Sequence, residues 1–493
     1  MRPATLLRLA VAGNRTDRLR TVLTALSAAL AAVTLLAAAT VVAIQGEAER
    51  YSSALLAESG LRPGVATALM LLAMPALALA GQCIRLGAPA RDRRLAAIRL
   101  AGATPGQTVL IAGAETIAAA LLGSIAGFGG FLLLREILER RDAEGMLLLP
   151  TDVLPPPVPI AVVLLTVPVI AGLVGTVLLR RVVISPLGVV RRIRTRGPLP
   201  WPGVLIVAGL LLFALPRWLG SIGGTVLTTI LSAGVALTML GVVLGTGWIG
   251  HTTGRLLRRF GTRPAMLLAG RRLTGDPWSG SRTLAALLAG VVAGAIALGY
   301  RAKVQTDFRA VELYNQAAGG DSGAGFAADE GFYVGAIDLV MVAVGVGMTV
   351  AAAGVLVTLA ESIVARRRAY AAMTAVGVPR LTLSEAVLWH TLTPLVPALL
   401  LALGSGLGIA RLMGTEATVG NSSTYICDAA CQAGTGEPVE VLNPPHAVTV
   451  AVPVPVETLA LLGGGAFLAM VIVAGFGLLV LRSSTDLEEL RAG

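Results

Sequence analysis

The chain alternates between long apolar runs and short segments that are basic, polar or rich in glycine and proline. Ten of the apolar runs are about as long as the 17–25 residues that a helix needs to cross a bilayer. We therefore expect an all-α polytopic membrane protein. The predicted spans lie near residues 21–45, 61–84, 106–133, 157–179, 201–217, 222–249, 283–300, 337–363, 387–413 and 457–481. The first run is too long for the apolar core of a signal peptide, so we expect it to be retained.

The composition agrees with this pattern. Hydrophobic residues make up 55% of the chain and charged residues 14%, whereas a soluble domain carries about 25% charge. These values exclude a soluble globular enzyme, a disulfide-rich secreted module and a disordered chain. Lys303 is the sole lysine among 39 basic residues. Such an Arg-rich, Ala-rich composition suggests a high-GC bacterium, and hence the bacterial plasma membrane.

The basic residues also predict an orientation. If the N-terminus is cytoplasmic, the inner segments hold 29 of the 39 Lys and Arg residues, and most acidic residues fall outside. The positive-inside rule then places both termini in the cytoplasm. Topology and contact with anionic lipid account for the arginine clusters, so we expect no nucleic-acid partner. The inner segments are residues 1–20, 85–104, 180–200, 250–282, 364–386 and 482–493.

Two inner loops repeat each other. RDRRLAAIRLAG (91–102) and RRRAYAAMTAVG (366–377) share five of twelve positions at a fixed offset of 275 residues. A second similarity links residues 7–30 with residues 266–290. Six predicted spans separate the matching loops, so both copies have the same orientation, which argues against an inverted-repeat carrier.

The repeat predicts the domain organisation. We expect a first four-span repeat over residues 1–196 and a second over residues 263–493. A two-helix linker, residues 197–262, joins them.

Each repeated loop has the pattern of a short basic helix. Gly102 and Gly377 are placed to end it in a left-handed conformation, and Pro105 and Pro379 follow, where proline prevents continuation. A helix held between two spans could act as a lever for a cytosolic partner. It could equally lie on lipid headgroups, and the spacing alone leaves both interpretations open.

These motifs resemble the permease signature of FtsX-like ABC transporters, the FtsX/MacB type. The resemblance rests on the Arg-rich helix, its glycine turn and Glu115, 13 residues after Gly102. The segments 13–26, 121–130 and 180–192 are similar to further family segments in the same order, and 481–491 is a looser match. The resemblance implies coupling to an ATPase through two helices. Their residues are Arg91, Arg93, Arg94 and Gly102 in the first copy, and Arg366, Arg367, Arg368 and Gly377 in the second.

The resemblance also implies a function. The chain would be the transmembrane subunit of an ABC transporter that exports or extrudes an amphiphile, such as a lipid, lipoprotein, peptide or drug. Two copies of a separate ABC ATPase would be its partners. The alternatives are a non-transporting signalling subunit and an ion-driven carrier, for which the sequence offers few midplane charges. Family members often carry a large outer domain, but the corresponding loops here, 46–60 and 301–336, are short.

The chain lacks the residues of an ATPase site. A phosphate-binding loop needs a lysine in G-x-x-x-x-G-K-[ST], and Lys303 has no such context. The histidines His251, His390 and His446 have no metal-ligand spacing. We therefore expect no enzymatic activity, metal or cofactor in this chain.

A few polar residues remain to be placed. Glu115 lies inside the third span, where a carboxylate is paired, snorkelling or functional. His390 occupies the matching position of the second copy, so the role of Glu115 is lost there or its register differs. Cys427 and Cys431 lie in a predicted outer loop, where a disulfide or two free thiols are both open. Cys83 is predicted to pack as a small hydrophobe.

Overall fold

The chain folds into long helices that run side by side. The computed structural model describes residues 15–46, 50–59, 61–83, 100, 102, 104–183, 197–219, 224–317, 330–420, 424–426, 439–441 and 447–483. Within them, ten helical stretches are long and apolar enough to cross a membrane. The prediction of an all-α polytopic membrane protein is therefore confirmed.

The helices and strands are numbered in chain order. The helices are α2 (Arg15–Ala43), α3 (Ala54–Ala57), α4 (Arg62–Cys83), α6 (Pro105–Ile137), α7 (Pro157–Val183), α8 (Trp201–Ala214), α9 (Pro216–Leu219), α10 (Gly224–Phe260), α11 (Pro264–Gly275), α12 (Pro277–Ala317), α13 (Glu330–Ala365), α14 (Arg367–Ala375), α15 (Arg380–Leu392), α16 (Leu395–Met413) and α18 (Val456–Ser483). The strands are β1 (Glu416–Val419), β2 (Thr424–Ile426), β3 (Val439–Val441) and β4 (Val448–Ala451).

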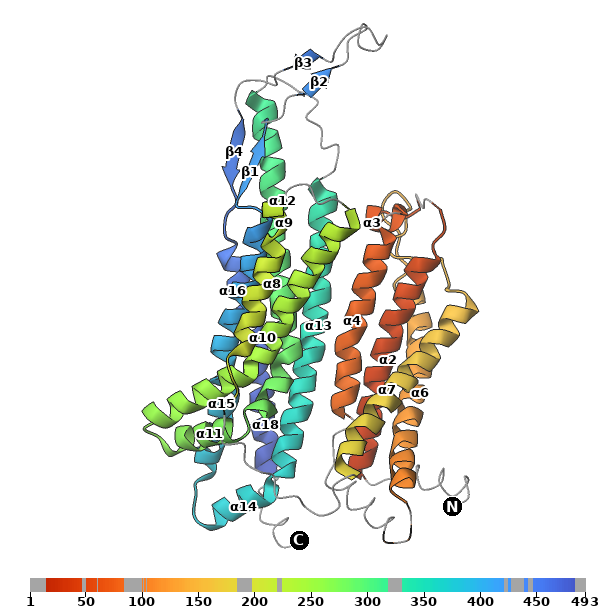
Figure 1. The fold of residues 1–493 in the computed structure, drawn as a ribbon. Helices are drawn as coiled ribbons and strands as arrows, with labels where there is room; N and C mark the ends of the chain where they lie inside the picture. The colour runs from red at the N-terminus through yellow and green to blue at the C-terminus, as the bar shows by residue number, and fades with distance from the viewer. Residues whose placement is uncertain are drawn as a thin grey trace.

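The bundle has two distinct ends (Figure 1). We call the end where α2 begins and α18 finishes the basal end. The end that holds the four strands is the distal end. The small helices α11 and α14 lie at the basal end.

Helices α2, α4, α6 and α7 pack together as a first group. Their shared core consists largely of alanine, including the fully buried Ala28, Ala31 and Ala120. On α6, Gly123 and Gly127 lie so close to α2 that a Cβ atom would meet the backbone of Ala25 and Ala29. Small residues permit such close packing, which stabilises helix pairs in lipid.

The second group contains α12, α13, α15, α16 and α18, and α8 and α10 pack beside it. Its core is larger and is built from branched side chains. Leu287, Leu288, Val291 and Val292 of α12 are all fully buried there. The two groups meet where α4 packs against α13, with Gln82 lying over Gly354.

The two groups use the same order of packing. Helix α2 packs on α4 and α6, and α12 packs on α13 and α16. Both α2 and α12 run from the basal to the distal end, and α4 and α13 return (Figure 1). This arrangement supports two like-oriented repeats.

The largest differences from the prediction lie in three regions. Helix α12 continues to Ala317, well beyond the predicted end at residue 300. Its polar extension includes the Lys303–Asp307 ion pair and packs against β1 and β4. Between α16 and α18 the chain forms two antiparallel strand pairs, β1–β4 and β2–β3, where no strand was predicted. The ninth predicted span is divided into α15 and α16 next to Pro394.

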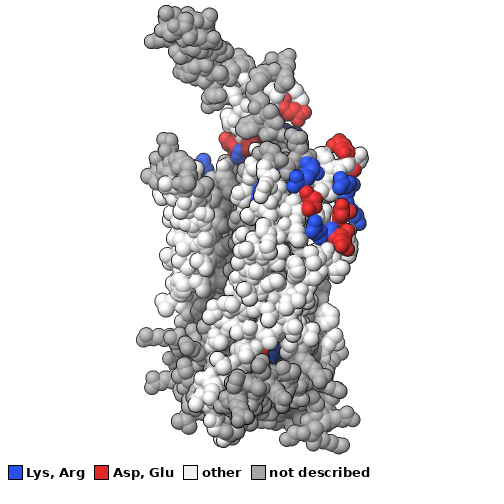
Figure 2. Space-filling model, turned by 90° about the vertical axis from the view of Figure 1, so that its right-hand side faces the viewer, with Lys and Arg blue, Asp and Glu red and all other residues white. Residues whose placement is uncertain are grey.

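The outer surface of the bundle suits lipid. Large apolar side chains such as Leu122, Leu165 and Leu468 are more than half exposed. Figure 2 shows a broad uncharged belt on one face, with charged side chains gathered toward one end. Apolar surface of this extent is typical of membrane-embedded helices.

Candidate coupling and substrate sites

Helix α14 lies where the second repeated loop predicts a short helix. It covers Arg367–Ala375, directly after α13. Gly377 then takes a φ of +95°. Its N–H donates to the carbonyl of Thr374, and that of Val378 donates to Met373, each at 3.0 Å. These two bonds form a Schellman motif, so the helix ends in a left-handed glycine as predicted.

The glycine of the first repeated loop has the same backbone conformation. Gly102 also has a φ of +95°. Helix α6 begins just after it, and the side chains and backbones of Thr104 and Gln107 cap each other reciprocally. Arg91, Arg93 and Arg94 lie outside the described residues, as do Cys427, Cys431 and the side chains of Arg367 and Arg368. Arg366 is exposed at the start of α14.

Glu115 forms a buried ion pair inside the first group. Its Oε2 atom lies 2.7 Å from Nη2 of Arg20 on α2. The two side chains are only 10% and 9% exposed. A carboxylate at this depth is costly unless it is paired. The paired alternative for Glu115 is therefore the observed one, and it joins α2 to α6 near the basal end.

His390 occupies a different setting in the second group. It is buried on α15, and its Nε2 atom has no hydrogen-bond partner in the described structure. It shares a small cavity with Arg272 of α11 and Arg366. Arg272 Nη1 donates a hydrogen bond of 2.7 Å to the hydroxyl of Tyr370 on α14. The second group thus has a half-buried arginine beside a buried histidine, whereas the first has a buried Arg–Glu pair.

A large apolar cavity lies in the distal half, between the first group and α13. Its volume is about 700 Å³. The lining is mostly aliphatic and aromatic and comes from α2, α4, α6, α13 and the distal loops. Among the lining residues are Val33, Leu69, Phe131, Phe332, Ala336 and Leu339. A cavity of this size and polarity fits the apolar part of a small amphiphile.

Polar contacts hold the distal loops around this cavity. Arg62 donates hydrogen bonds to the carbonyls of Ile44, Leu56 and Ala57. The Tyr51 hydroxyl donates to Asp152 at 2.6 Å. Burial, together with this hydrogen bond, raises the pKa of the Tyr51 phenol, so the hydroxyl keeps its proton at neutral pH. The loops therefore form a fixed rim.

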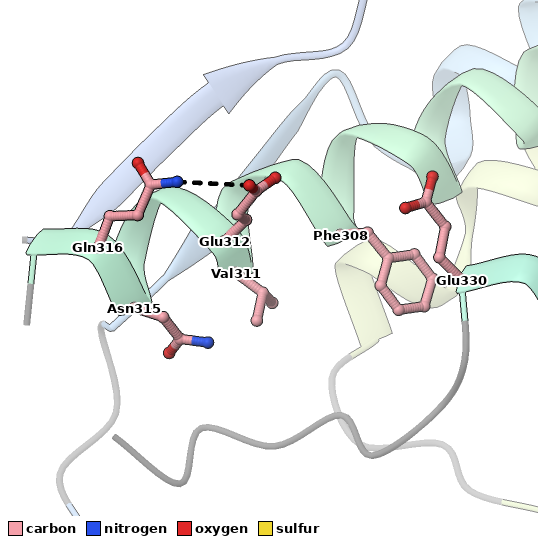
Figure 3. Close-up of a pocket in the computed structure, with 6 residues that line it drawn as sticks. All are labelled: Phe308, Val311, Glu312, Asn315, Gln316 and Glu330. Carbon is pink, nitrogen blue, oxygen red and sulfur yellow. Dashed lines mark hydrogen bonds between the residues drawn. The ribbon is translucent and has the colours of Figure 1, made fainter. Parts of the chain in front are cut away.

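A second distal hollow, of about 520 Å³, lies between the ends of α12 and α13 (Figure 3). Two carboxylates, Glu312 and Glu330, and two amides line it, and Gln316 donates a hydrogen bond of 3.3 Å to Glu312. This acidic, polar lining is less suited to an apolar tail than the larger cavity is.

The sequence indicated Glu115 and His390 as candidate site residues, but it did not indicate their basic neighbours. Arg20 could have been found, because a basic residue at the start of one span invites pairing with a carboxylate at the same depth of another. Arg272 gives no such local signal, since its partner Tyr370 is 98 residues away. Cys83 is a buried free thiol on α4, as predicted.

Comparison with known proteins identifies the family. The sequence matches the family described as FtsX-like permease C-terminal over residues 64–187 and again over residues 341–486. No curated protein matches the chain. The two matched segments fall in the first and second helix groups respectively and together cover more than half of the sequence. The chain therefore belongs to the FtsX-like permease family.

Proposed function

We propose that this chain is the transmembrane subunit of an ABC transporter that moves an amphiphilic substrate. The family assignment makes it a permease component of the ABC-transporter type. The observation that carries the finer proposal is the apolar cavity of about 700 Å³ between the first helix group and α13. ATP hydrolysis would take place on a separate ATPase, in two copies.

The orientation is part of the proposal. The basal end would face the cytoplasm and both termini would lie there. Basic residues of α10 and α11 support this, because Arg255, Arg258, Arg259 and Arg271 gather at the basal end. The positive-inside rule places such residues in the cytoplasm, here of a bacterial cell.

The coupling route would run along α13. This helix is continuous from Glu330 to Ala365. Its distal end contributes Phe332 and Leu339 to the cavity, and its basal end leads directly into α14. An ATPase that moves α14 would therefore move one wall of the cavity. The segment 91–102 would act in the same way on α4 and α6.

We infer the domain boundaries from the same arrangement. Residues 1–196 would form the first repeat and residues 263–493 the second. The linker, residues 197–262, would include α8 and α10. Close packing of α8 on α10 at Gly209 and Gly234 supports a linker that forms a helix pair of its own.

Filling the cavity should block transport without unfolding the chain. Gly335 lines the cavity, and a Cβ atom there meets nothing within 4 Å. We expect Gly335→Phe to lower ATP-dependent movement of a fluorescent lipid or lipopeptide by at least about tenfold, because the ring takes the place of the apolar tail. Transport is measured in proteoliposomes that contain the chain and its ATPase.

Gly345→Phe is the matched control. Gly345 lies on the same helix, is exposed, has open space around it and does not line the cavity. Transport should stay near the wild-type rate in this variant. Equal loss in both variants would contradict the cavity as the substrate path.

The turn after α14 should matter for coupling. Alanine in a left-handed conformation costs about 1–2 kcal/mol, so Gly377→Ala should weaken stimulation of the ATPase by the permease several-fold. Asparagine tolerates this conformation better than other residues with side chains. Gly377→Asn should therefore retain most of the stimulation, and the reverse order would refute the proposed turn. The measurement is ATPase activity of the reconstituted complex.

A signalling subunit is the second candidate. The distal extension of α12, with β1 and β4 packed on it, favours it by offering a surface beyond the bundle. ATPase stimulation without ATP-dependent movement of any lipid, peptide or drug tested would favour signalling over transport.

A further inference from the structure

A small basal cavity in the second group collects positive charge. It lies between α11, α13 and α15 and has a volume of about 70 Å³, several times what one water molecule needs. Its nitrogen-bearing side chains are Arg272 of α11, Arg366 at the start of α14 and His390 of α15. The hydroxyls of Thr358, Ser362 and Thr391 also line it, and each donates its proton to a backbone carbonyl of its own helix.

Two nitrogen atoms in this cavity lack partners. His390 is 8% exposed, and neither its Nε2 atom nor Nε of Arg272 has a hydrogen-bond partner in the described part of the chain. Burial lowers the pKa of the Arg272 guanidinium, and the charge of Arg366 acts in the same direction. Buried donors without acceptors cost about 1–3 kcal/mol each, more when they are charged. The cavity is therefore set up for an acceptor that carries negative charge.

The first group shows what this acceptor would be. There the buried guanidinium of Arg20 is neutralised by Glu115. At the matching position of the second copy, 13 residues after the turn glycine, stands His390. None of the described carboxylates forms an ion pair with Arg272, although the charge of Asp276 acts on it from farther away. In the described part of the second group, no carboxylate therefore pairs with Arg272 as Glu115 pairs with Arg20 in the first.

We propose that the cavity of Arg272, Arg366 and His390 binds a phosphate-class oxyanion, supplied as the headgroup phosphate of a lipid with net negative charge or as free phosphate. Guanidinium groups bind phosphate through paired N–H donors. The imidazole of His390 can donate to a further oxygen. Arg366 lines the cavity and is exposed, so the anion would enter beside it from the basal surface. This site goes beyond the proposed function and does not depend on transport.

The proposal is tested by binding to the purified full chain, without any ATPase. One arm uses neutral detergent and equilibrium dialysis against labelled inorganic phosphate. The other uses phosphatidylcholine nanodiscs with and without phosphatidylglycerol, and follows the melting temperature. Binding in the first arm identifies free phosphate as a ligand. Stabilisation in the second arm alone identifies the lipid headgroup.

Three variants locate the site. Arg272→Gln and Arg366→Gln should each weaken binding by at least about tenfold, the effect of losing one charge-assisted hydrogen bond. His390→Glu places a carboxylate where the first group has one. It should raise the melting temperature without added anion and remove the response to phosphate or phosphatidylglycerol. Arg366 is exposed, so Arg366→Gln is expected to fold. It can therefore test the site even if Arg272→Gln does not fold.

Arg263→Gln is the matched control. Arg263 is an exposed basal residue that precedes α11 and does not line this cavity. The Arg263→Gln variant should bind the anion as the wild type does. The proposal is overturned if neither arm shows a response. It is also overturned if His390→Glu and Arg366→Gln respond as strongly as Arg263→Gln.

Discussion

Replacing Glu115 by glutamine is expected to lower the free energy of unfolding by about 3–5 kcal/mol, the usual result of breaking a buried ion pair on one side. The carboxylate lies 2.7 Å from Arg20, and both side chains are about nine-tenths buried. Without it, the buried Arg20 guanidinium loses the carboxylate that it contacts on α6. The effect is measured by thermal and denaturant unfolding of the purified chain in detergent.

A double variant separates the lost charge from the lost contact. Arg20→Met combined with Glu115→Leu removes both charges and should recover most of the stability, because apolar residues of similar volume replace a buried pair at little cost. Glu136→Gln is the control, because Glu136 lies on α6 as Glu115 does but is exposed. This variant should change the free energy of unfolding by less than about 0.5 kcal/mol. A cost for Glu115→Gln no larger than this control would refute a stabilising pair.

The spans could be predicted because lipid imposes a simple rule. A helix must present about 20 apolar residues to cross the membrane, and this signal lies within each segment. The conformation of the turn glycines could also be predicted. Gly102 and Gly377 each end a basic segment shortly before a proline, and both take the expected left-handed φ. Both predictions use information within a few residues of the feature.

The missed elements depend on contacts rather than on apolar runs. The distal part of α12 is polar enough to resemble a loop, but it is helical and buries Ala310 and Tyr314 where β1 and β4 pack on it. Strands β1 and β4 are each four residues long, so the alternation of apolar and polar residues along them is too short to stand out. Such elements are fixed by their neighbours.

The candidate sites show the same limit. Glu115 stood out because a carboxylate inside a span is rare, yet its partner lies 95 residues away. The distal cavity needs residues of α2, α4, α6 and α13 together, and no single segment signals it. Unusual residues stand out in the sequence, whereas the fold decides what surrounds them.

The close contact between α2 and α6 leads to the second large effect. Gly123 and Gly127 stand four residues apart on α6, and a Cβ atom at Gly123 would lie 2.2 Å from the carbonyl oxygen of Ala25. Because this atom belongs to a helix backbone, it cannot turn aside as a side chain can. Gly123→Val is expected to cost about 3 kcal/mol, at the upper end of the usual cost of overpacking, since the helices would have to separate.

Gly130 provides the control on the same helix. A Cβ atom there meets nothing within 4 Å, so Gly130→Ala should be neutral or should stabilise by up to about 1 kcal/mol through better helix propensity. Gly123→Ala should already destabilise, and Gly127→Ala should do so less, because its nearest backbone atom is 2.6 Å away instead of 2.2 Å. Unfolding in detergent gives this order. If Gly123→Ala and Gly130→Ala were equally stable, α2 and α6 would not approach so closely. The Arg20–Glu115 pair, which joins these two helices, would then need another geometry.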